Sequence, residues 1–213
     1  MRTLIFLGSL MLALVARAEE PMERFRYLMA DPARQAQAYA AGQERIVLCG
    51  YCHGEDGNSK RPHIPNLAGQ NPAYLFQSFE RFANGQRSDF VMSRLAATLT
   101  PDERANIAVY FSQQAVRPST EPVDPALMAA GQALYQRTCV SCHGERAQGL
   151  EQMPRLAGQP AHYLRHALTG FRDKDPRRSG SVMMSIAEPL SDADIASLAA
   201  YLQALTQVPE QGT

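Results

Sequence analysis

The chain has 213 residues, of which 45% are hydrophobic, and this composition is ordinary for one large or two small globular domains. Its 21 basic and 21 acidic side chains give a formal net charge of zero. Nucleic-acid binding leaves a strong basic excess on a sequence, and none is found here. We therefore expect other proteins or small molecules as partners, and no nucleic acid.

The first 18 residues have the pattern of a secretory signal peptide. An early arginine is followed by an apolar stretch from Leu4 to Val15 and by a small-x-small ending at Ala18. An uncleaved membrane anchor is the alternative, but a span needs roughly 18 to 20 apolar residues, and this stretch is shorter. The sequence thus predicts export to the periplasm, with cleavage after Ala18.

The rest of the chain contains an internal repeat. The segment "CGYCHGEDGNS" at residues 49–59 reappears as "CVSCHGERAQG" at residues 139–149, and "PNLAGQ" reappears as "PRLAGQ". Similarity at a fixed spacing indicates two homologous units. We predict the following divisions: signal peptide 1–18, N-terminal extension 19–37, first domain 38–116, linker 117–124 and second domain 125–213.

Helical signals dominate both repeats, and no stretch shows the sustained alternation of a strand. The predicted fold class is therefore all-α, with two tandem domains. Helix starts are expected at Asn71, Thr100, Asp124 and Ser191, and helix ends at Gly85 and Gly170.

Two further expectations concern how these helices pack. Gly42 and Gly131 should each allow a facing helix to approach closely. Ile46 stands where the second repeat has Tyr135, so an aromatic contact between helices is expected to be weaker in the first repeat.

The repeated Cys-x-x-Cys-His motif allows three kinds of chemistry. A redox dithiol is usually found in a βαβ context, which is absent from the sequence. A zinc site closed by both cysteine pairs would leave His53 and His143 without a role. Covalent haem attachment uses all the residues, because two thiols on one turn add to the porphyrin and the histidine faces the iron. The motif therefore favours two covalently bound haem groups.

A haem iron that only transfers electrons needs a sixth ligand, and methionine in that place raises the reduction potential. A Val-Met pair recurs in register in both repeats, seven residues before a leucine, and supplies Met92 and Met183. Met184 aligns with Ser93 and stays an alternative to Met183.

Taken together, the two motifs and their flanking segments resemble the dihaem cytochrome c4 family, whose members consist of two class I cytochrome c domains. The resemblance covers about residues 38–206. It implies haem attachment at Cys49, Cys52, Cys139 and Cys142. It implies axial ligation by His53 with Met92 and by His143 with Met183, and it places Pro65 and Pro154 beside the two histidines. Residues 19–37 lie outside the family pattern, and we expect them to form a loosely docked extension.

The predicted function is that of a periplasmic electron carrier and not of an enzyme. The expected donor is a quinol-cytochrome c reductase or a dehydrogenase, and the expected acceptor is a terminal oxidase. A cytochrome subunit of a dehydrogenase and a dihaem peroxidase stay open as alternatives. We expect a monomer, with peripheral membrane association left open. The basic segment "RDKDPRRSGS" in the second repeat predicts a higher reduction potential for the second haem.

Overall fold

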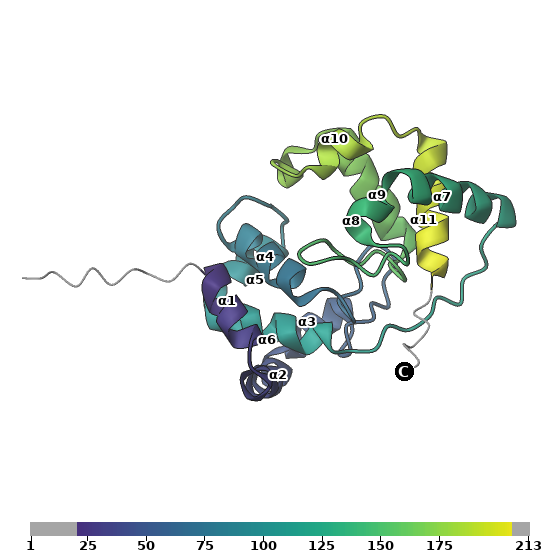
Figure 1. Ribbon diagram of the computed structural model, residues 1–213. Helices are drawn as coiled ribbons and strands as arrows, with labels where there is room; N and C mark the ends of the chain where they lie inside the picture. Colours follow the sequence, from purple (N-terminus) through teal and green to yellow (C-terminus); the bar gives the residue numbers. More distant parts are fainter. Residues whose placement is uncertain (1–20, 206–213) are drawn as a thin grey trace, which may run out of the picture.

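The computed structural model describes residues 21–205, and within this range the regular elements are helices (Figure 1). The all-α prediction is confirmed. One lobe contains α1 (Pro21–Met29), α2 (Pro32–Arg45), α3 (Val47–His53), α4 (Pro72–Ala83), α5 (Met92–Thr98) and α6 (Pro101–Ser112). The other contains α7 (Pro125–Thr138), α8 (Val140–His143), α9 (Ala161–Arg172), the 3-10 helix η1 (Pro176–Arg178), α10 (Met183–Ala187) and α11 (Asp192–Ala204). The predicted signal peptide lies outside the described residues.

The two lobes repeat one arrangement of helices. Helix α2 packs on α6 as α7 packs on α11, and α4 contacts α5 and α6 as α9 contacts α10 and α11. Each lobe has its own hydrophobic core. The predicted linker lies within residues 113–124, a helix-free stretch between α6 and α7. None of the helices between residues 21 and 205 is long and apolar enough to cross a membrane.

Side-chain caps explain where the main helices begin. The Asn71 carboxamide accepts a hydrogen bond from the Ala73 N–H at 3.0 Å, and the Asp124 carboxylate accepts one from the Ala126 N–H at 2.8 Å. Thr100 and Ser191 each form a reciprocal capping box with the acidic residue three positions later. Such caps are each worth about 1 kcal/mol. All four predicted helix starts are confirmed.

The two predicted helix ends have different outcomes. Gly85 follows α4 with a φ of 80°, which confirms the predicted end. Gly170 lies inside α9, so that prediction was wrong. A glycine costs a helix interior only about 1 kcal/mol. Here the next residues stabilise the final turn, because Phe171 packs on the second core and Arg172 donates to Asp192 at 2.6 Å.

The first and last helices of each repeat cross where a glycine removes a side chain. A Cβ added to Gly42 would overlap the carbonyl oxygen of Asn106 on α6, and one added to Gly131 would overlap that of Ser197 on α11. Any side chain at these positions would push the helices apart. The predicted close approach is confirmed in both lobes.

Both crossings also contain an aromatic pair. In the second lobe the ring centroids of Tyr135 and Tyr201 are 5.6 Å apart. In the first lobe Ile46 occupies the aligned position, but Tyr39 places its ring 5.1 Å from Tyr110. The expectation of a weaker aromatic contact was wrong, because a tyrosine from an earlier turn of α2 replaces it.

The described part of the N-terminal extension is packed against the first lobe. Phe25 on α1 is 3% exposed and stacks on Phe76 with centroids 4.7 Å apart. Arg24 forms an ion pair with Asp102 on α6 at 2.8 Å. Helix α2 continues through the predicted boundary between residues 37 and 38. The loose docking expected for this segment is therefore replaced by core packing.

Two glutamines join the lobes reciprocally. The Gln70 side chain accepts from the Arg155 N–H at 2.7 Å and donates to the Arg155 carbonyl at 2.9 Å. The Gln159 side chain accepts from the Asn66 N–H at 3.0 Å and donates to the Asn66 carbonyl at 2.8 Å. Each glutamine comes from the repeated "LAGQ" and binds the backbone of the opposite lobe. The contact between lobes therefore has an approximate two-fold relation.

Candidate functional site

Each Cys-x-x-Cys-His motif lies on a short helix that follows the first long helix of its repeat. Cys49, Cys52 and His53 lie on α3. In the second lobe Cys139 lies between α7 and α8, and Cys142 and His143 lie on α8. All four thiols are free. Both motifs therefore present two unpaired thiols and a histidine within one short segment.

The state of the thiols argues against a redox dithiol. Burial raises the pKa of the Cys49 thiol, and it raises the pKa of Cys139 to about 11. A dithiol active in redox exchange needs a lowered thiol pKa, which is the opposite shift. The zinc alternative is not supported either, since no three His, Cys, Asp or Glu side chains gather as metal ligands within residues 21–205.

The two histidines are held identically. His53 Nδ1 lies 2.9 Å from the carbonyl oxygen of Pro65, and His143 Nδ1 lies 2.9 Å from that of Pro154. A carbonyl only accepts, so Nδ1 carries the proton and Nε2 keeps its lone pair. The rings are 8% and 4% exposed. Each lobe thus offers one oriented imidazole nitrogen as an iron ligand.

The environment also keeps these histidines neutral. Burial lowers the pKa of His53 and of His143, with the proline carbonyls acting in the opposite direction. The carboxylate of Asp89 also favours the charged form of His53. Because burial is the largest cause, both imidazoles are neutral at neutral pH. Neutral imidazole is the form that binds a metal.

The candidate methionines stand at equivalent places, each as the first residue of a short helix. Met92 begins α5, its N–H donates to the Asp89 carboxylate at 2.9 Å, and its side chain packs on the core that contains Cys49. Met183 begins α10, and its N–H donates to the Ser181 hydroxyl at 3.3 Å. Met183 and Met184 are both half-buried. The shared helix position favours Met183 as the counterpart of Met92.

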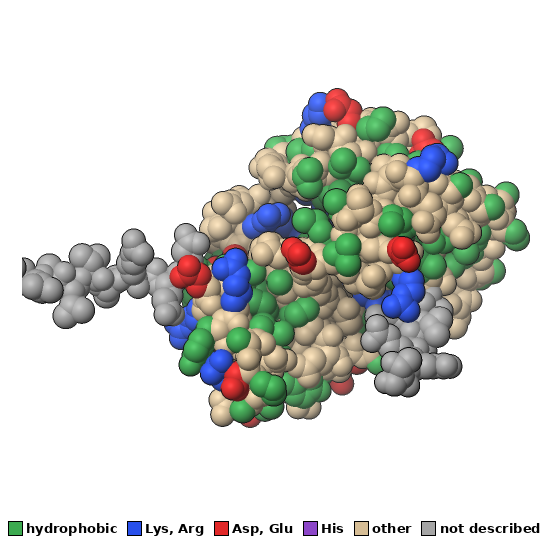
Figure 2. Space-filling view, in the orientation of Figure 1, with side chains coloured by type: hydrophobic (Ala, Val, Ile, Leu, Met, Phe, Trp, Pro, Cys, Tyr) green, Lys and Arg blue, Asp and Glu red, His purple; other side chains and the backbone are tan. Residues whose placement is uncertain are grey.

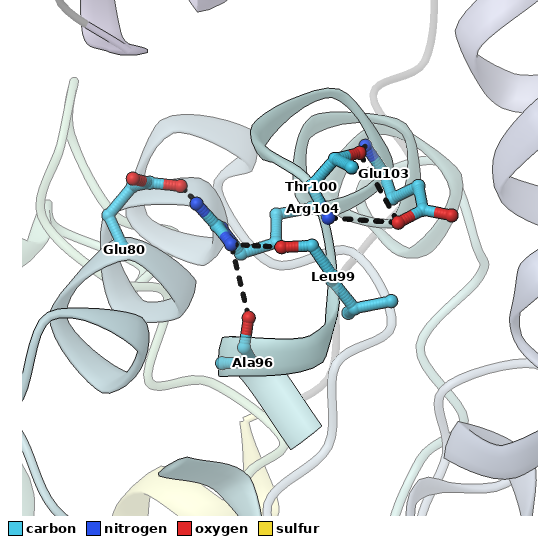
Figure 3. A network of polar contacts seen from close by, with 6 residues as sticks. All are labelled: Glu80, Ala96, Leu99, Thr100, Glu103 and Arg104. Carbon is cyan, nitrogen blue, oxygen red and sulfur yellow. Dashed lines mark hydrogen bonds and ion pairs between the residues drawn. The ribbon is translucent and has the colours of Figure 1, made fainter. Parts of the chain in front are cut away.

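A buried arginine anchors the methionine helix of the first lobe (Figure 3). Arg104 on α6 is 7% exposed, and its Nε donates to Glu80 on α4 at 2.6 Å. Its Nη1 donates to the carbonyls of Ala96 and Leu99, at the end of α5. The Arg104 side chain therefore fixes α5, which begins with Met92, to α4 and α6.

The second lobe uses apolar packing at the same place. The capping boxes of α6 and α11 align Arg104 with Ile195, which is 3% exposed and belongs to the second core. Ala187 at the end of α10 and Leu190 lie in that core too. At the position of Arg104, the second lobe therefore holds α10 by the apolar packing of Ile195 and not by a buried ion pair.

The basic segment of the second lobe is largely neutralised by ion pairs. Its closest contacts are Arg172 with Asp192 at 2.6 Å, Arg177 with Asp175 at 2.7 Å and Lys174 with Glu188 at 2.8 Å. Paired charges produce a weaker field at a distance than the unpaired cations would. The charge argument for a higher potential of the second haem therefore loses most of its basis.

Both lobes fit a covalently bound haem. Free thiols on one helical turn can form two thioether bonds, and the proline carbonyl leaves Nε2 of the histidine as the iron ligand. Cys49 belongs to the first core and Met92 packs against it, while Cys139 packs against the second core.

Residues beyond these were missed at the sequence level. Gln70 and Gln159 were not singled out, although the identical "LAGQ" in both repeats was a usable signal. Arg155 was missed as well, because nothing in the sequence shows that its side chain is 1% exposed.

Known proteins similar to this chain point to one family. Residues 128–206 match the cytochrome c family. Cytochrome c4 from Pseudomonas aeruginosa is 38% identical, over 78% of this chain and 88% of that protein. A thiosulfate dehydrogenase electron acceptor from Thiomonas intermedia is 32% identical, over 78% of this chain and 82% of that protein. The crystal structure of reduced recombinant cytochrome c4 from Pseudomonas stutzeri superposes with a TM-score of 0.72 at 33% identity, covering 78% of this chain and 98% of that one.

These similarities agree with the duplicated lobes, the free thiols and the oriented histidines. The cofactors are two covalently bound haem c groups, and the partners are redox proteins. The chain belongs to the cytochrome c4 family, and it is a dihaem c-type cytochrome that carries electrons and is not an enzyme.

Proposed function

We propose that the protein moves single electrons in the periplasm through two sites of His/Met ligation. The proposed attachment residues are Cys49, Cys52, Cys139 and Cys142. The proposed axial ligands are His53 with Met92 in the first lobe and His143 with Met183 in the second. The observation that carries this proposal is the repeated contact between a buried histidine Nδ1 and a proline carbonyl, 2.9 Å in both lobes.

The chain's own residues determine what these sites can do. Haem iron supplies a one-electron couple when bound, and a methionine ligand raises its potential. Pro65 and Pro154 orient the histidine rings and increase the basicity of Nε2. Met92 and Met183 would each supply the remaining protein ligand of one iron, which would leave no ligand position for a substrate. Two closed sites support electron transfer without catalysis.

The proposed location and partners follow from the sequence. Residues 1–18 are a signal peptide cleaved after Ala18, and the mature chain is periplasmic. Its proposed donor is a quinol-cytochrome c reductase or a dehydrogenase, and its proposed acceptor is a terminal oxidase. Without Arg2 and Arg17 the mature chain keeps 19 basic and 21 acidic side chains, and this small net charge of −2 indicates recognition through local surface patches and not through a strong overall field.

Two measurements test this proposal. The intact mass of protein from the periplasmic fraction should equal residues 19–213 plus two haems. A mass with one haem or none contradicts it. The purified protein should also be fully reduced by quinol in the presence of a quinol-cytochrome c reductase and reoxidised by a terminal oxidase.

A second function is supported by the similarity to the thiosulfate dehydrogenase electron acceptor. In this function the donor is a dehydrogenase that oxidises a sulfur compound, and the haem sites are unchanged. Spectroscopy cannot separate the two functions, so the donor must be varied. Rapid reduction by thiosulfate with its dehydrogenase, combined with no reduction by the quinol enzyme, would favour this second function.

A further inference from the structure

One buried side chain between the lobes lacks the partner that its charge requires. Arg155 is 1% exposed, and its Nε donates to the Ala157 carbonyl at 2.9 Å. Its Nη1 and Nη2 atoms are buried and have no hydrogen-bond partner among the residues that the structure describes. A buried cation without a partner is costly, so native structures almost always supply one.

The position of this guanidinium is fixed from both lobes. Gln70 of the first lobe binds the backbone N–H and carbonyl of Arg155. A Cβ added to Gly69 would lie 3.8 Å from Nη1, and one added to Gly158 would lie 3.8 Å from Nη2. The two unpartnered nitrogens therefore lie between the "LAGQ" turns of the two repeats, where the lobes meet.

Arg155 is also close to the second candidate haem site along the chain. It directly follows Pro154, whose carbonyl oxygen lies 2.9 Å from His143 Nδ1. The aligned residue in the first repeat is Asn66, whose Nδ2 donates to the Gly158 carbonyl at 2.8 Å. The Asn66 side chain thus has a protein hydrogen-bond partner, whereas Nη1 and Nη2 of Arg155 have none among the described residues.

The missing partner is an anion that the described residues do not provide. Burial lowers the pKa of Arg155 to about 10, and no charged side chain contributes to this shift. The group is still a cation at neutral pH. Its two free nitrogens are the terminal pair of a planar fork, which matches a carboxylate in bidentate geometry. Haem carries two propionate carboxylates, and two haems bring four of them to this chain.

We propose that the Arg155 guanidinium binds a haem propionate at the contact between the lobes and keeps that carboxylate ionised. The assignment rests on the haem content of the protein and not on its redox partners. Because Gln70 holds Arg155 from the opposite lobe, the same contact links the environment of one haem to the docking of the two lobes.

This pairing has a definite effect on the reduction potential. Reduction lowers the positive charge of the iron by one, so a nearby unneutralised carboxylate favours the oxidised form. Removing Arg155 should therefore lower the midpoint potential of the haem that it serves. As the pH falls and the exposed carboxyl gains a proton, that potential should rise again.

The experiment is a redox titration of the purified dihaem protein across about pH 5 to 9 for Arg155→Gln and wild type. At neutral pH we expect the variant to shift the reduced-to-oxidised ratio of one haem about tenfold at a fixed potential, which is about 59 mV for a one-electron couple. The same wave should become pH-dependent in the variant only. The same titration in a Met92→His background, which should lower the midpoint potential of the first haem only, assigns each wave to a lobe. The wave that Arg155→Gln shifts then shows which haem Arg155 serves.

Arg172→Gln is the control for loss of one positive charge, because the two carboxylates that it uncovers, Asp173 and Asp192, are exposed and screened by solvent. It should leave both waves unchanged. If Arg155→Gln does not accumulate, Arg155→Lys replaces it: the ammonium should keep the midpoint at neutral pH, and the midpoint should fall at alkaline pH where the ammonium loses its proton. Variants with both haems attached and with wild-type midpoints at every pH would overturn the proposal and leave Arg155 a structural role.

Discussion

The two lobes present equivalent candidate haem-site residues but stabilise the surrounding helices by different physical means. In both, a proline carbonyl orients the histidine and a short helix begins with the candidate methionine. The first lobe fixes that helix with the buried Arg104, whereas the second places Ile195 at the aligned position. The candidate ligands are thus repeated residue by residue, while the packing that supports them has diverged.

The largest expected effect tests whether the methionines are equivalent. Met92→Ala and Met183→Ala should each abolish the methionine-to-iron charge-transfer absorption of one haem, because each removes one thioether ligand. The oxidised spectra of the single variants and of the double variant provide the measurement. Met184→Ala is the matched control and should retain both contributions. If Met184→Ala loses one charge-transfer contribution and Met183→Ala loses none, the ligand of the second haem is Met184 and not Met183.

Replacing Arg104 by isoleucine, the residue at the aligned position 195 of the second lobe, tests whether the buried arginine is needed to hold α5. Arg104→Ile leaves Glu80 and two helix-end carbonyls without their partner, which should destabilise the first lobe by about 3 kcal/mol. Chemical denaturation followed through the methionine band of the first haem would measure the change. In the second lobe, Ile195→Val should cost only about 1 kcal/mol. Equal and small effects would mean that Arg104 does not anchor α5.

The helix α1 gives the first lobe a contact that has no counterpart among the described helices of the second. Phe25→Ala should lower the free energy of unfolding by about 3 kcal/mol, because Phe25 is buried and stacks on Phe76. Tyr27 on the same helix is 66% exposed, so Tyr27→Ala should cost less than about 1 kcal/mol. If the two variants unfold at the same denaturant concentration, α1 does not contribute to the core.

The smallest expected effect concerns the loop of the second lobe. Hydrogen bonds from Arg177 hold the pKa of Asp175 at about 2, so its stabilising contribution is present above the unfolded pKa of about 4 and is lost as the pH falls through about 2. Asp175→Asn should lower the unfolding free energy by less than about 1 kcal/mol at neutral pH. Thermal unfolding from about pH 6 to about pH 3 should show this difference shrinking. A difference independent of pH would assign it to another cause.

Local signals in the sequence predicted many of the helix starts and helix crossings, while the roles proposed for the candidate site residues stay predictions. Caps such as Thr100 and Ser191 predicted helix starts correctly, because they satisfy backbone N–H groups within three residues. Gly42 and Gly131 likewise predicted the helix crossings. Gly170 misled, since packing and ion pairs beyond it outweighed its low helix propensity.

Contacts between distant segments were not predictable from the sequence. Tyr39 replaces an aromatic partner from a different helix position, which the alignment of repeats cannot show. The side chains of Gln70 and Gln159 bind the backbone of the opposite lobe. Because almost every residue offers the same backbone groups, the residue type of the partner does not reveal such a contact. The ion pairing of "RDKDPRRSGS" was not predictable for a related reason, because Asp192, an acidic partner of Arg172, lies on a separate helix.

The central claim is that both lobes hold a haem closed by histidine and methionine. Electron paramagnetic resonance of the fully oxidised wild-type protein tests it most directly, because the spin state of ferric iron reports whether a sixth protein ligand is bound. The account predicts two low-spin ferric signals that together represent all the haem in the sample. A high-spin signal from either lobe, or ready binding of carbon monoxide after reduction, would contradict it.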